Sequence, residues 1–299
     1  MRVLITGGSG VVGSYYVKNF VMKRHEVHYT SLNNSVEIYG AERHTVNLGK
    51  NDEVDSIIAK IKPELVIHTA ALSSVDTCEI NRNLAYEVNV NGTSRMVDLC
   101  RSINSFLIYI STTSVFDGIK DIYNELDRPN PINYYAYTKM LGENLVKRLG
   151  QAYLILRIDQ PYGWIMDGQK QNSVVRALNK LDSDEVLNEI IDWYNNPTFL
   201  NDIVDATDLL LNNNKTGLYH AVGPDHIDRY SWSLIVADIF ERDKNLIKPI
   251  SASQLHLPAK RPNVNASNAK IKDEVGFTFA GIRDGLLHMK SHKDQRDDK

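Results

Sequence analysis

Cysteine and long apolar runs are both scarce in this sequence. The chain has 299 residues but only two cysteines, Cys78 and Cys100, too few for a disulfide framework and without the spacing of a metal site. No stretch approaches the roughly 20 consecutive apolar residues that a membrane helix needs. A strand-like run already begins at Arg2, which leaves no room for a signal peptide. We therefore expect a cytoplasmic protein with reduced cysteines and no membrane contact.

An excess of charge of one sign is missing as well. The formal net charge is −3 and the basic residues are dispersed, so the composition gives no reason to expect a nucleic-acid partner. His288 and His292 lie one helical turn apart, a spacing that can bind metal, but no further ligand is near them in the sequence. We therefore expect neither nucleic acid nor a metal ion.

Short apolar runs alternate with segments at helical spacing along the first half of the chain. Strands are expected at Arg2–Thr6, Glu26–Ser31, Leu65–His68, Phe106–Ile110 and Tyr153–Arg157, and helices at Val11–Met22, Glu53–Ile61, Asn83–Ser102 and Tyr134–Leu149. This alternation predicts an α/β fold with a doubly wound parallel sheet of the Rossmann type.

The alternation loosens from about Gly163 onward. Helices are expected there near Asn201–Leu211 and Trp232–Glu241, with a strand at Gly217–Ala221 between them. We expect a first domain over residues 1–160. Residues 161–299 are expected to form mostly a smaller substrate-binding lobe, with segments that return to the first domain.

A glycine-rich turn follows the first predicted strand and has the spacing G-x-x-G-x-x-G. Gly7 permits a tight turn, Gly10 lets the backbone approach a pyrophosphate, and Gly13 allows the helix to pack closely on the strand. Free N–H groups at the start of the next helix favour phosphate binding. The residues expected to bind a dinucleotide here are Gly7, Ser9, Gly10, Val11, Val12 and Gly13.

The end of the second predicted strand lacks a carboxylate. It reads Thr30-Ser31-Leu32-Asn33, whereas NAD-binding proteins use an acidic residue there to bind the ribose 2′-hydroxyl and repel a 2′-phosphate. A hydroxyl group such as that of Ser31 can accept a 2′-phosphate, and Lys23 and Arg24 lie just upstream. The sequence therefore favours NADP as the cofactor, with NAD left open, and residues 1–160 are the expected NAD(P)-binding domain.

A Tyr-x-x-x-Lys pair, Tyr135 and Lys139, lies on a predicted helix. Residues four apart share one helix face, so the phenol and the ammonium can serve one site. A nearby ammonium is expected to lower the pKa of the tyrosine, as suits a general acid that protonates a carbonyl oxygen. Thr112 follows a predicted strand at the end that faces the ligand crevice, where its hydroxyl can bind the same carbonyl.

Several segments together resemble an extended short-chain dehydrogenase/reductase. They are Thr6–Gly13, Val66–Ala71, Val88–Thr93, Ser111–Gly118 and Tyr135–Lys139. Within that superfamily the chain resembles the dTDP-4-dehydrorhamnose reductases at Val75-Asp76, Val115–Gly118, Asn130–Tyr135, Asn196–Thr198, Gly217–Pro224 and Lys260–Pro262. The resemblance implies that Thr112 is the catalytic hydroxyl, Tyr135 the proton donor and Lys139 the supporting lysine.

The resemblance also implies further cofactor contacts. Asn89 matches an asparagine that orders the active-site helix and its water. Thr69, Ala70 and Ala71 match the segment that lines the cofactor. Asn47 and Leu48 fall where the family usually has an acidic residue near the adenine.

Departures from the family pattern concentrate on the substrate side. The family usually has Asp and Tyr where this chain has Thr113 and Ser114, and commonly Trp where this chain has Gln160. An aromatic platform for the base or sugar could come from Tyr162 or Trp164, although core packing explains both equally well. The expected substrate-binding residues are Ser73, Val75, Thr113, Gln160 and Trp164.

The resemblance implies NAD(P)H-dependent reduction of a 4-keto sugar nucleotide, with hydride passing to C4. A sugar-nucleotide epimerase is one alternative, whereas a 4,6-dehydratase needs an Asp-Glu pair that Thr113 and Ser114 do not supply. The other alternative is a non-catalytic, NADP-binding regulatory subunit that resembles the one of methionine adenosyltransferase. The oligomeric state is left open, with a homodimer among the options.

Overall fold

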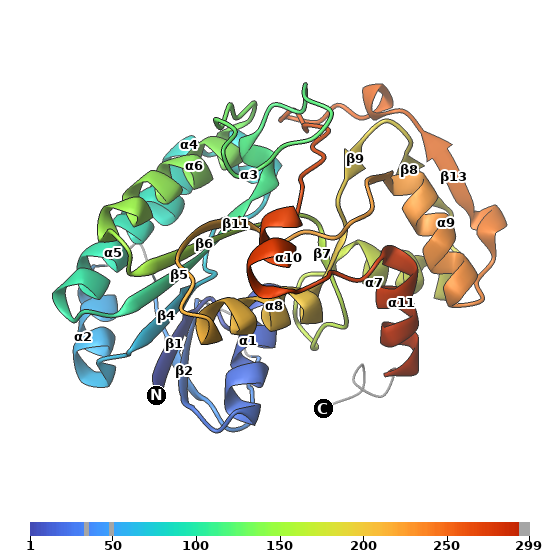
Figure 1. The fold of residues 1–299 in the computed structure, drawn as a ribbon. Helices are drawn as coiled ribbons and strands as arrows, with labels where there is room; N and C mark the ends of the chain where they lie inside the picture. Colours follow the sequence, from blue (N-terminus) through green and yellow to red (C-terminus); the bar gives the residue numbers. More distant parts are fainter. Residues whose placement is uncertain (33–35, 48–50, 293–299) are drawn as a thin grey trace.

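A seven-stranded parallel sheet forms the centre of the larger part of the molecule (Figure 1). The computed structural model describes residues 1–32, 36–47 and 51–292. The strands run in the order β11-β6-β5-β4-β1-β2-β3, and all neighbours are parallel. Their bounds are β1 Arg2–Thr6, β2 Glu26–Ser31, β3 Glu42–Thr45, β4 Leu65–His68, β5 Phe106–Thr112, β6 Tyr153–Ile158 and β11 Gly217–His220. The predicted doubly wound sheet is confirmed, and its order reverses between β1 and β4, where such sheets bind ligands.

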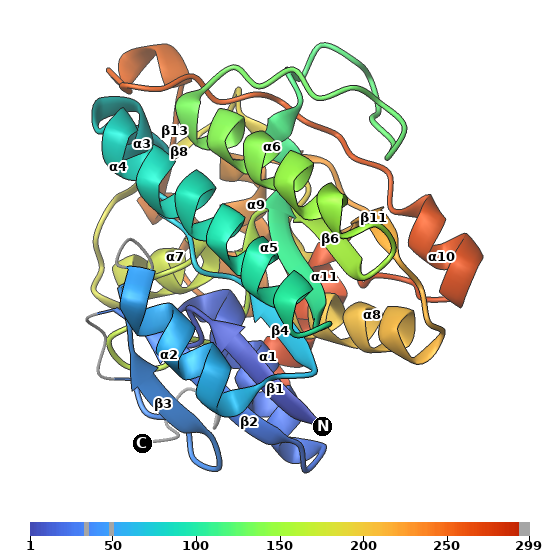
Figure 2. The ribbon, with the colours of Figure 1, turned by 90° about the vertical axis from the view of Figure 1, so that its left-hand side faces the viewer.

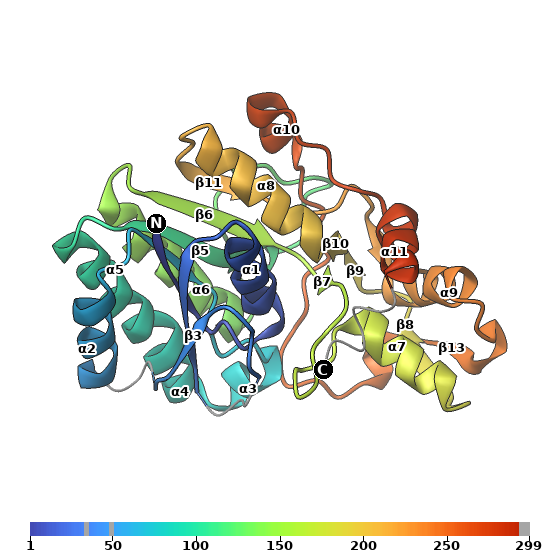
Figure 3. The ribbon, with the colours of Figure 1, turned by 90° about the horizontal axis from the view of Figure 1, so that it is seen from below.

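Helices cover both faces of the sheet (Figures 2 and 3). One face carries α1 Val11–Met22, α8 Leu200–Asn212 and α10 Ala269–Val275, and the other carries α2 Asn51–Ile61, α5 Gly92–Ser102 and α6 Tyr134–Val146. Because successive strand residues point to opposite faces, Ile5 of β1 packs in the first core and Leu4 in the second. Within the described ranges, no helix combines the length and the apolar character that crossing a membrane requires.

A separate hydrophobic core builds the smaller lobe, at the right of Figure 1. It contains α7 Ser173–Asp182, α9 Arg229–Ile239 and α11 Ile282–Ser291, with the parallel strand pair β8 Leu187–Ile190 and β13 Ile247–Ile250. Two short pairs lie nearby, β7 Pro161–Tyr162 with β10 Thr198–Phe199 and β9 Tyr194–Asn195 with β12 Ile227–Asp228. Since β11 belongs to the sheet, and α8 and α10 pack on one of its faces, the chain passes between the two cores repeatedly. The division at residue 160 stays a prediction.

Some elements differ from the sequence-based expectation. Strand β3 was not predicted, because it lies at the sheet edge and its residues Glu-Arg-His-Thr are polar. Strand β5 continues to Thr112 instead of ending at Ile110. The helix expected over Asn83–Ser102 is divided into α4 Arg82–Tyr86, a π turn Glu87–Asn91 and α5. The remaining elements are α3 Val75–Ile80 and 3₁₀ turns at Thr113–Val115, Lys147–Leu149, Lys244–Leu246 and Ala252–Gln254.

Candidate active site

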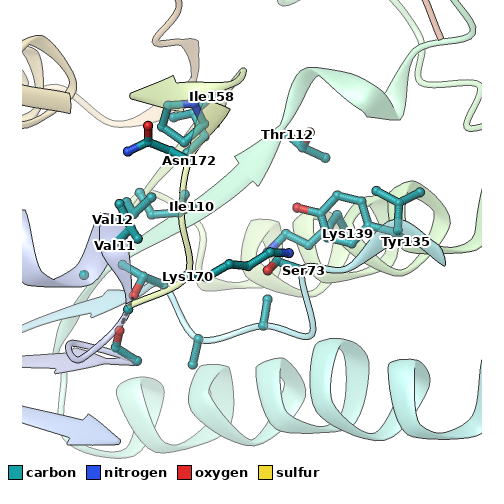
Figure 4. Close-up of a pocket in the computed structure, with 18 of the residues that line it drawn as sticks. Val11, Val12, Ser73, Ile110, Thr112, Tyr135, Lys139, Ile158, Lys170 and Asn172 are labelled. Carbon is teal, nitrogen blue, oxygen red and sulfur yellow. Dashed lines mark hydrogen bonds between the residues drawn. The ribbon is translucent and has the colours of Figure 1, made fainter. Parts of the chain in front are cut away.

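A cavity of about 1190 Å³ lies between the carboxyl ends of the sheet strands and the smaller lobe (Figure 4). Its sheet-side wall comes from the glycine turn, the residues at the ends of β2, β4, β5 and β6, and the start of α6. Its other wall comes from residues 168–173, Arg176, Trp193, Arg229 and Arg261. The cavity therefore lies at the point where the strand order reverses.

Most of the predicted site residues line this cavity. They are Gly7, Ser9, Gly10, Val11, Val12, Gly13, Ser31, Asn47, Thr69, Ala70, Ala71, Ser73, Val75, Thr112, Tyr135, Lys139 and Gln160. Asn89, Thr113 and Trp164 do not line it, and Leu48 lies outside the described residues.

Two glycines in the turn leave no room for a side chain. Gly7 has a φ of +68°, and a Cβ there would lie 2.8 Å from Ala70 Cα. A Cβ on Gly13 would lie 2.8 Å from Gly8 Cα and closer still to the Gly7 carbonyl oxygen, so α1 packs directly on the turn. No side chain caps α1 at Gly10, which leaves the first amides of the helix available to an anion.

The end of β2 forms the neighbouring part of the wall. Thr30 Oγ1 accepts a hydrogen bond from the Gly7 amide at 3.1 Å, which joins β2 to the glycine turn. Ser31, Leu32 and Asn47 line the cavity beyond it. Among the described residues, no carboxylate lines this end of the cavity.

Thr112 and Tyr135 both line the cavity, and the Thr112 side chain is close enough to lower the pKa of the Tyr135 phenol. Thr112 ends β5, and its Oγ1 also accepts a bond from the Ser114 amide at 3.1 Å. Tyr135 lies in the first turn of α6, where Asn133 caps the helix by accepting from the Ala136 amide at 2.9 Å. Lys139 follows one turn later, and Figure 4 shows it beside Tyr135 on the same helix.

Burial moves the pKa values of Tyr135 and Lys139 in opposite directions. Burial raises the pKa of Tyr135, with Cys78 adding to the rise, so the phenol keeps its proton at neutral pH. The expectation that the tyrosine pKa is lowered is therefore wrong in this structure, because desolvation outweighs the lowering effect of Thr112. Burial lowers the pKa of Lys139 to about 7, although the Glu143 carboxylate opposes this. The site thus holds a protonated phenol beside a lysine that titrates near neutrality.

A buried ion pair fixes α6 to the sheet beneath Lys139. Arg157 donates from Nε to Glu143 Oε1 at 2.8 Å and from Nη2 to Oε2 at 2.7 Å. Ser111 Oγ donates to the same carboxylate at 2.6 Å. Both members of the pair are at most 1% exposed. This bidentate arrangement holds α6 against β5 and β6 and places a negative charge near Lys139.

Asn89 contacts the active-site helix and not the cavity. From the π turn, its Oδ1 accepts from the Leu72 amide at 2.8 Å and its Nδ2 donates to Thr138 Oγ1 at 3.0 Å. Thr138 Oγ1 in turn donates to the Tyr135 carbonyl oxygen at 2.7 Å. Its position does not support the predicted cofactor contact, and it agrees with a role in ordering α6.

The sequence analysis predicted none of the residues of the lobe-side wall, and among those it missed are Trp193, Arg229 and Arg261. The guanidinium carbons of Arg229 and Arg261 lie 5.0 and 5.7 Å from the ring centroid of Trp193. Arg229 also donates to Gln160 Oε1 at 3.0 Å, and Arg261 pairs with Asp76 at 2.7 Å. The one available signal was the resemblance at Lys260–Pro262, which gave no role to Arg261.

Asp159 adds a buried carboxyl group to the same cavity. It is 5% exposed, and its Oδ2 accepts from the Asn196 amide at 2.8 Å. Burial raises its pKa to about 7, against the opposing effects of the Asn196 bond and the Arg229 charge. The cavity therefore holds a second group that titrates near neutrality.

Trp164 and Thr113 lie in packed interiors. Trp164 Nε1 donates to the Met289 carbonyl oxygen at 2.8 Å, and its ring meets Phe240 edge-on in the core of the smaller lobe. Tyr162 is fully buried in the same core, and Thr113 is 1% exposed. The predicted substrate contacts of Trp164 and Thr113 are therefore not supported, and Trp193 is the tryptophan that lines the cavity.

Gln169 joins the lobe to the glycine turn. Its side-chain amide donates to the Ser9 carbonyl oxygen and to Ser14 Oγ, both at 3.0 Å. Its neighbour Lys170 extends into the cavity in Figure 4. The segment thus lies against the glycine turn and the start of α1.

Known proteins resemble this chain over nearly its whole length. Residues 1–294 match the family described as RmlD substrate binding domain. The chain is 28% identical to dTDP-4-dehydrorhamnose reductase of Aggregatibacter actinomycetemcomitans, over 97% of this chain and 99% of that protein. It is also 28% identical to methionine adenosyltransferase 2 subunit beta of Bos taurus, over 87% of this chain and 78% of that protein.

Solved structures share the fold. A dTDP-4-dehydrorhamnose reductase from Bacillus anthracis in complex with NADP has a TM-score of 0.86 at 23% identity, covering 97% of this chain and 99% of that one. A UDP-glucose 4-epimerase from Thermus thermophilus in complex with NAD has a TM-score of 0.87 at 20% identity, covering 98% of each chain. With the family match over residues 1–294, the chain belongs to the RmlD family of the extended short-chain dehydrogenases/reductases, together with the dTDP-4-dehydrorhamnose reductases.

Proposed function

We propose that this protein reduces a 4-keto sugar nucleotide with NADPH. The observation that carries the proposal is the position of Thr112, Tyr135 and Lys139 between two halves of one cavity. One half begins at the glycine turn and suits a dinucleotide. The other half is lined by Arg229 and Arg261 and suits an anionic substrate.

The first half fits a nicotinamide dinucleotide. Gly7 and Gly13 let the backbone come close to a pyrophosphate, and the uncapped start of α1 offers amides to it. Ser31, without a carboxylate beside it in the described part of this wall, favours NADP over NAD. Thr69, Ala70 and Ala71 would line the path toward Lys139.

The second half fits a nucleotide diphosphate. Arg229 and Arg261 supply two guanidinium groups, which match phosphate oxygens in pairs. The Trp193 ring offers an aromatic face for a base or a sugar. Gln160 and Ser73 would lie nearer the reacting sugar.

The proposed reduction needs two things from the protein: a proton for the carbonyl oxygen of the sugar, and a hydrogen bond that holds this carbonyl in position. Reduced NADP, when bound, supplies the hydride for C4 of the sugar. Tyr135, protonated because burial raises its pKa, gives its proton to the carbonyl oxygen, so the ketone becomes a secondary alcohol. Thr112 orients that oxygen by a hydrogen bond, and the Lys139 ammonium binds the nicotinamide ribose and stabilises the phenolate that is left.

A regulatory subunit is the second candidate, because methionine adenosyltransferase 2 subunit beta is among the relatives at 28% identity. Such a protein would bind NADP and act through a partner. The position of Thr112, Tyr135 and Lys139 together in an open cavity favours catalysis instead. The cytoplasmic location remains a prediction from the sequence, and a homodimer remains one option for the oligomeric state.

Replacing Tyr135 by phenylalanine tests the proposal. Tyr135→Phe removes the proton donor and should lower kcat at least ~10²-fold, because general acids contribute about 10²–10⁴-fold, while the Kd for NADPH changes little. Tyr137→Phe is the matched control, since Tyr137 lies two residues away, is 41% exposed and does not line the cavity. A Tyr135→Phe variant of near-normal activity would refute the assignment.

A further inference from the structure

Three potential metal ligands converge at the edge of the sheet, away from the large cavity. His28 lies on β2, and Glu42 and His44 lie on β3, the outermost strand in Figure 2. His28 and Glu42 are direct neighbours in the strand register, and His44 lies two residues further on the same face. Their ligand atoms all lie within 4.8 Å of one another.

The distances between these atoms suit a small divalent cation. His28 Nδ1 lies 3.1 Å from His44 Nε2 and 3.4 Å from Glu42 Oε2, and His44 Nε2 lies 3.8 Å from Glu42 Oε1. Tetrahedral ligands at the zinc bond lengths of about 2.0–2.1 Å are separated by about 3.4 Å. The three groups could therefore bind one ion with little movement, with water as a fourth ligand.

Glu26 favours the tautomer of His28 that can bind a metal ion through Nδ1. His28 Nε2 lies 3.3 Å from Glu26 Oε1, so the Nε2–H can donate to that carboxylate. The proton is then on Nε2, and the lone pair of Nδ1 points at His44 and Glu42. A carboxylate behind a ligating histidine is the usual outer partner in zinc sites.

The cluster is open to solvent, and the ammonium group of Lys60 competes with a metal ion for the Glu42 carboxylate. A hollow of about 460 Å³ is lined by Arg2, Glu26, His28, Glu42, Lys60, Ile61 and Lys62. Lys60 Nζ lies 4.0 Å from Glu42 Oε1, but this lysine is 76% exposed and can turn away. The last residues of α2 also face this hollow, and the carboxyl end of a helix favours a cation.

We propose that His28, Glu42 and His44 form a binding site for one zinc-type divalent cation. Two imidazoles and one carboxylate are ligands that Zn²⁺ accepts in proteins. The ion would join β3 to β2 across the exposed edge of the sheet, and thus act on stability. The sequence analysis considered only His288 and His292 and did not predict β3, which brings Glu42 and His44 beside His28.

The test is titration of the full-length protein, without an affinity tag, with Zn²⁺ by calorimetry and with Co²⁺ by visible absorption. We expect one ion per chain and a Co²⁺ spectrum of tetrahedral type. His44→Gln should weaken Zn²⁺ binding at least ~10-fold, and Glu26→Gln by about 10–100-fold, as for other outer-shell partners. Lys60→Gln should strengthen binding, because it removes the competing ammonium.

The control variant replaces His288 of α11 and His292, which directly follows that helix, with glutamine. These two exposed rings stack with centroids 4.2 Å apart, and in the described part of the chain no cluster of three ligands includes them. This variant should bind Zn²⁺ as the parent does. Thermal melts without metal verify that each variant is folded. The proposal is overturned if the parent binds no Zn²⁺, if folded His44→Gln binds it unchanged, or if only the α11 variant loses it.

Discussion

Replacing Glu143 by glutamine tests how the protein controls the charge on Lys139. Burial lowers the pKa of Lys139 to about 7 and the Glu143 carboxylate raises it. The ammonium form, which the proposed mechanism needs, is present below that pKa and is lost as the pH rises through it. We therefore expect kcat/KM of the parent to fall above about pH 7. Glu143→Gln removes the charge that favours the ammonium, so the fall should begin at lower pH.

The size of the change follows from Coulomb's law. Side chains four residues apart on a helix are about 6 Å from each other. At that separation and an effective dielectric constant of about 20, two unit charges interact by about 3 kcal/mol, or about 2 pH units. We expect the high-pH limb of kcat/KM to move down by about 1–2 pH units.

Controls separate this effect from loss of structure. Glu143→Gln leaves Arg157 buried without its counter-ion, which costs about 3–5 kcal/mol, so urea unfolding is measured at the assay temperature. Ser111→Ala removes one hydrogen bond to the Glu143 carboxylate but keeps its negative charge. The high-pH limb of kcat/KM should therefore not move in this variant. Asp159→Asn removes the other group in the cavity with a pKa near 7, and this variant should also leave the high-pH limb of kcat/KM unchanged. The reasoning is refuted if the high-pH limb of kcat/KM does not move in folded Glu143→Gln, or if it moves to higher pH.

Two further predictions concern the two halves of the cavity. Gly13→Ala should weaken NADPH binding by about tenfold or more, measured by fluorescence titration, because the new Cβ pushes α1 off the turn; an unchanged Kd would contradict the packing argument. Arg229→Met should raise KM for the sugar nucleotide by about tenfold or more, because a bond to a charged group is lost, and should leave the Kd for NADPH unchanged. A loss confined to kcat would instead assign Arg229 to the chemical step.

The sheet and the candidate catalytic residues were predictable because local sequence determines them. Buried strands of a parallel sheet are continuous apolar runs, and their carboxyl ends meet at one edge, so Thr112 could be placed beside Tyr135 from the sequence alone. Four-residue spacing on α6 then added Lys139.

The lobe-side wall and the pKa values depend on packing that the sequence does not reveal. Trp164 is as aromatic as Trp193, and only the fold puts the first in a core and the second in the cavity. The expected fall in the pKa of Tyr135 was wrong because burial, which is a tertiary property, outweighs the nearby polar groups. Strand β3 was missed because an edge strand can be polar along its length.

The most direct test is to mix the purified protein with NADPH and a 4-keto sugar nucleotide and follow the near-ultraviolet absorbance of NADPH. The dTDP, UDP and GDP forms should be compared, each with NADPH and with NADH. The account predicts a lasting loss of absorbance, with one NADPH oxidised per keto group reduced to a hydroxyl. Tight binding of NADPH with no oxidation on any of these substrates would contradict it.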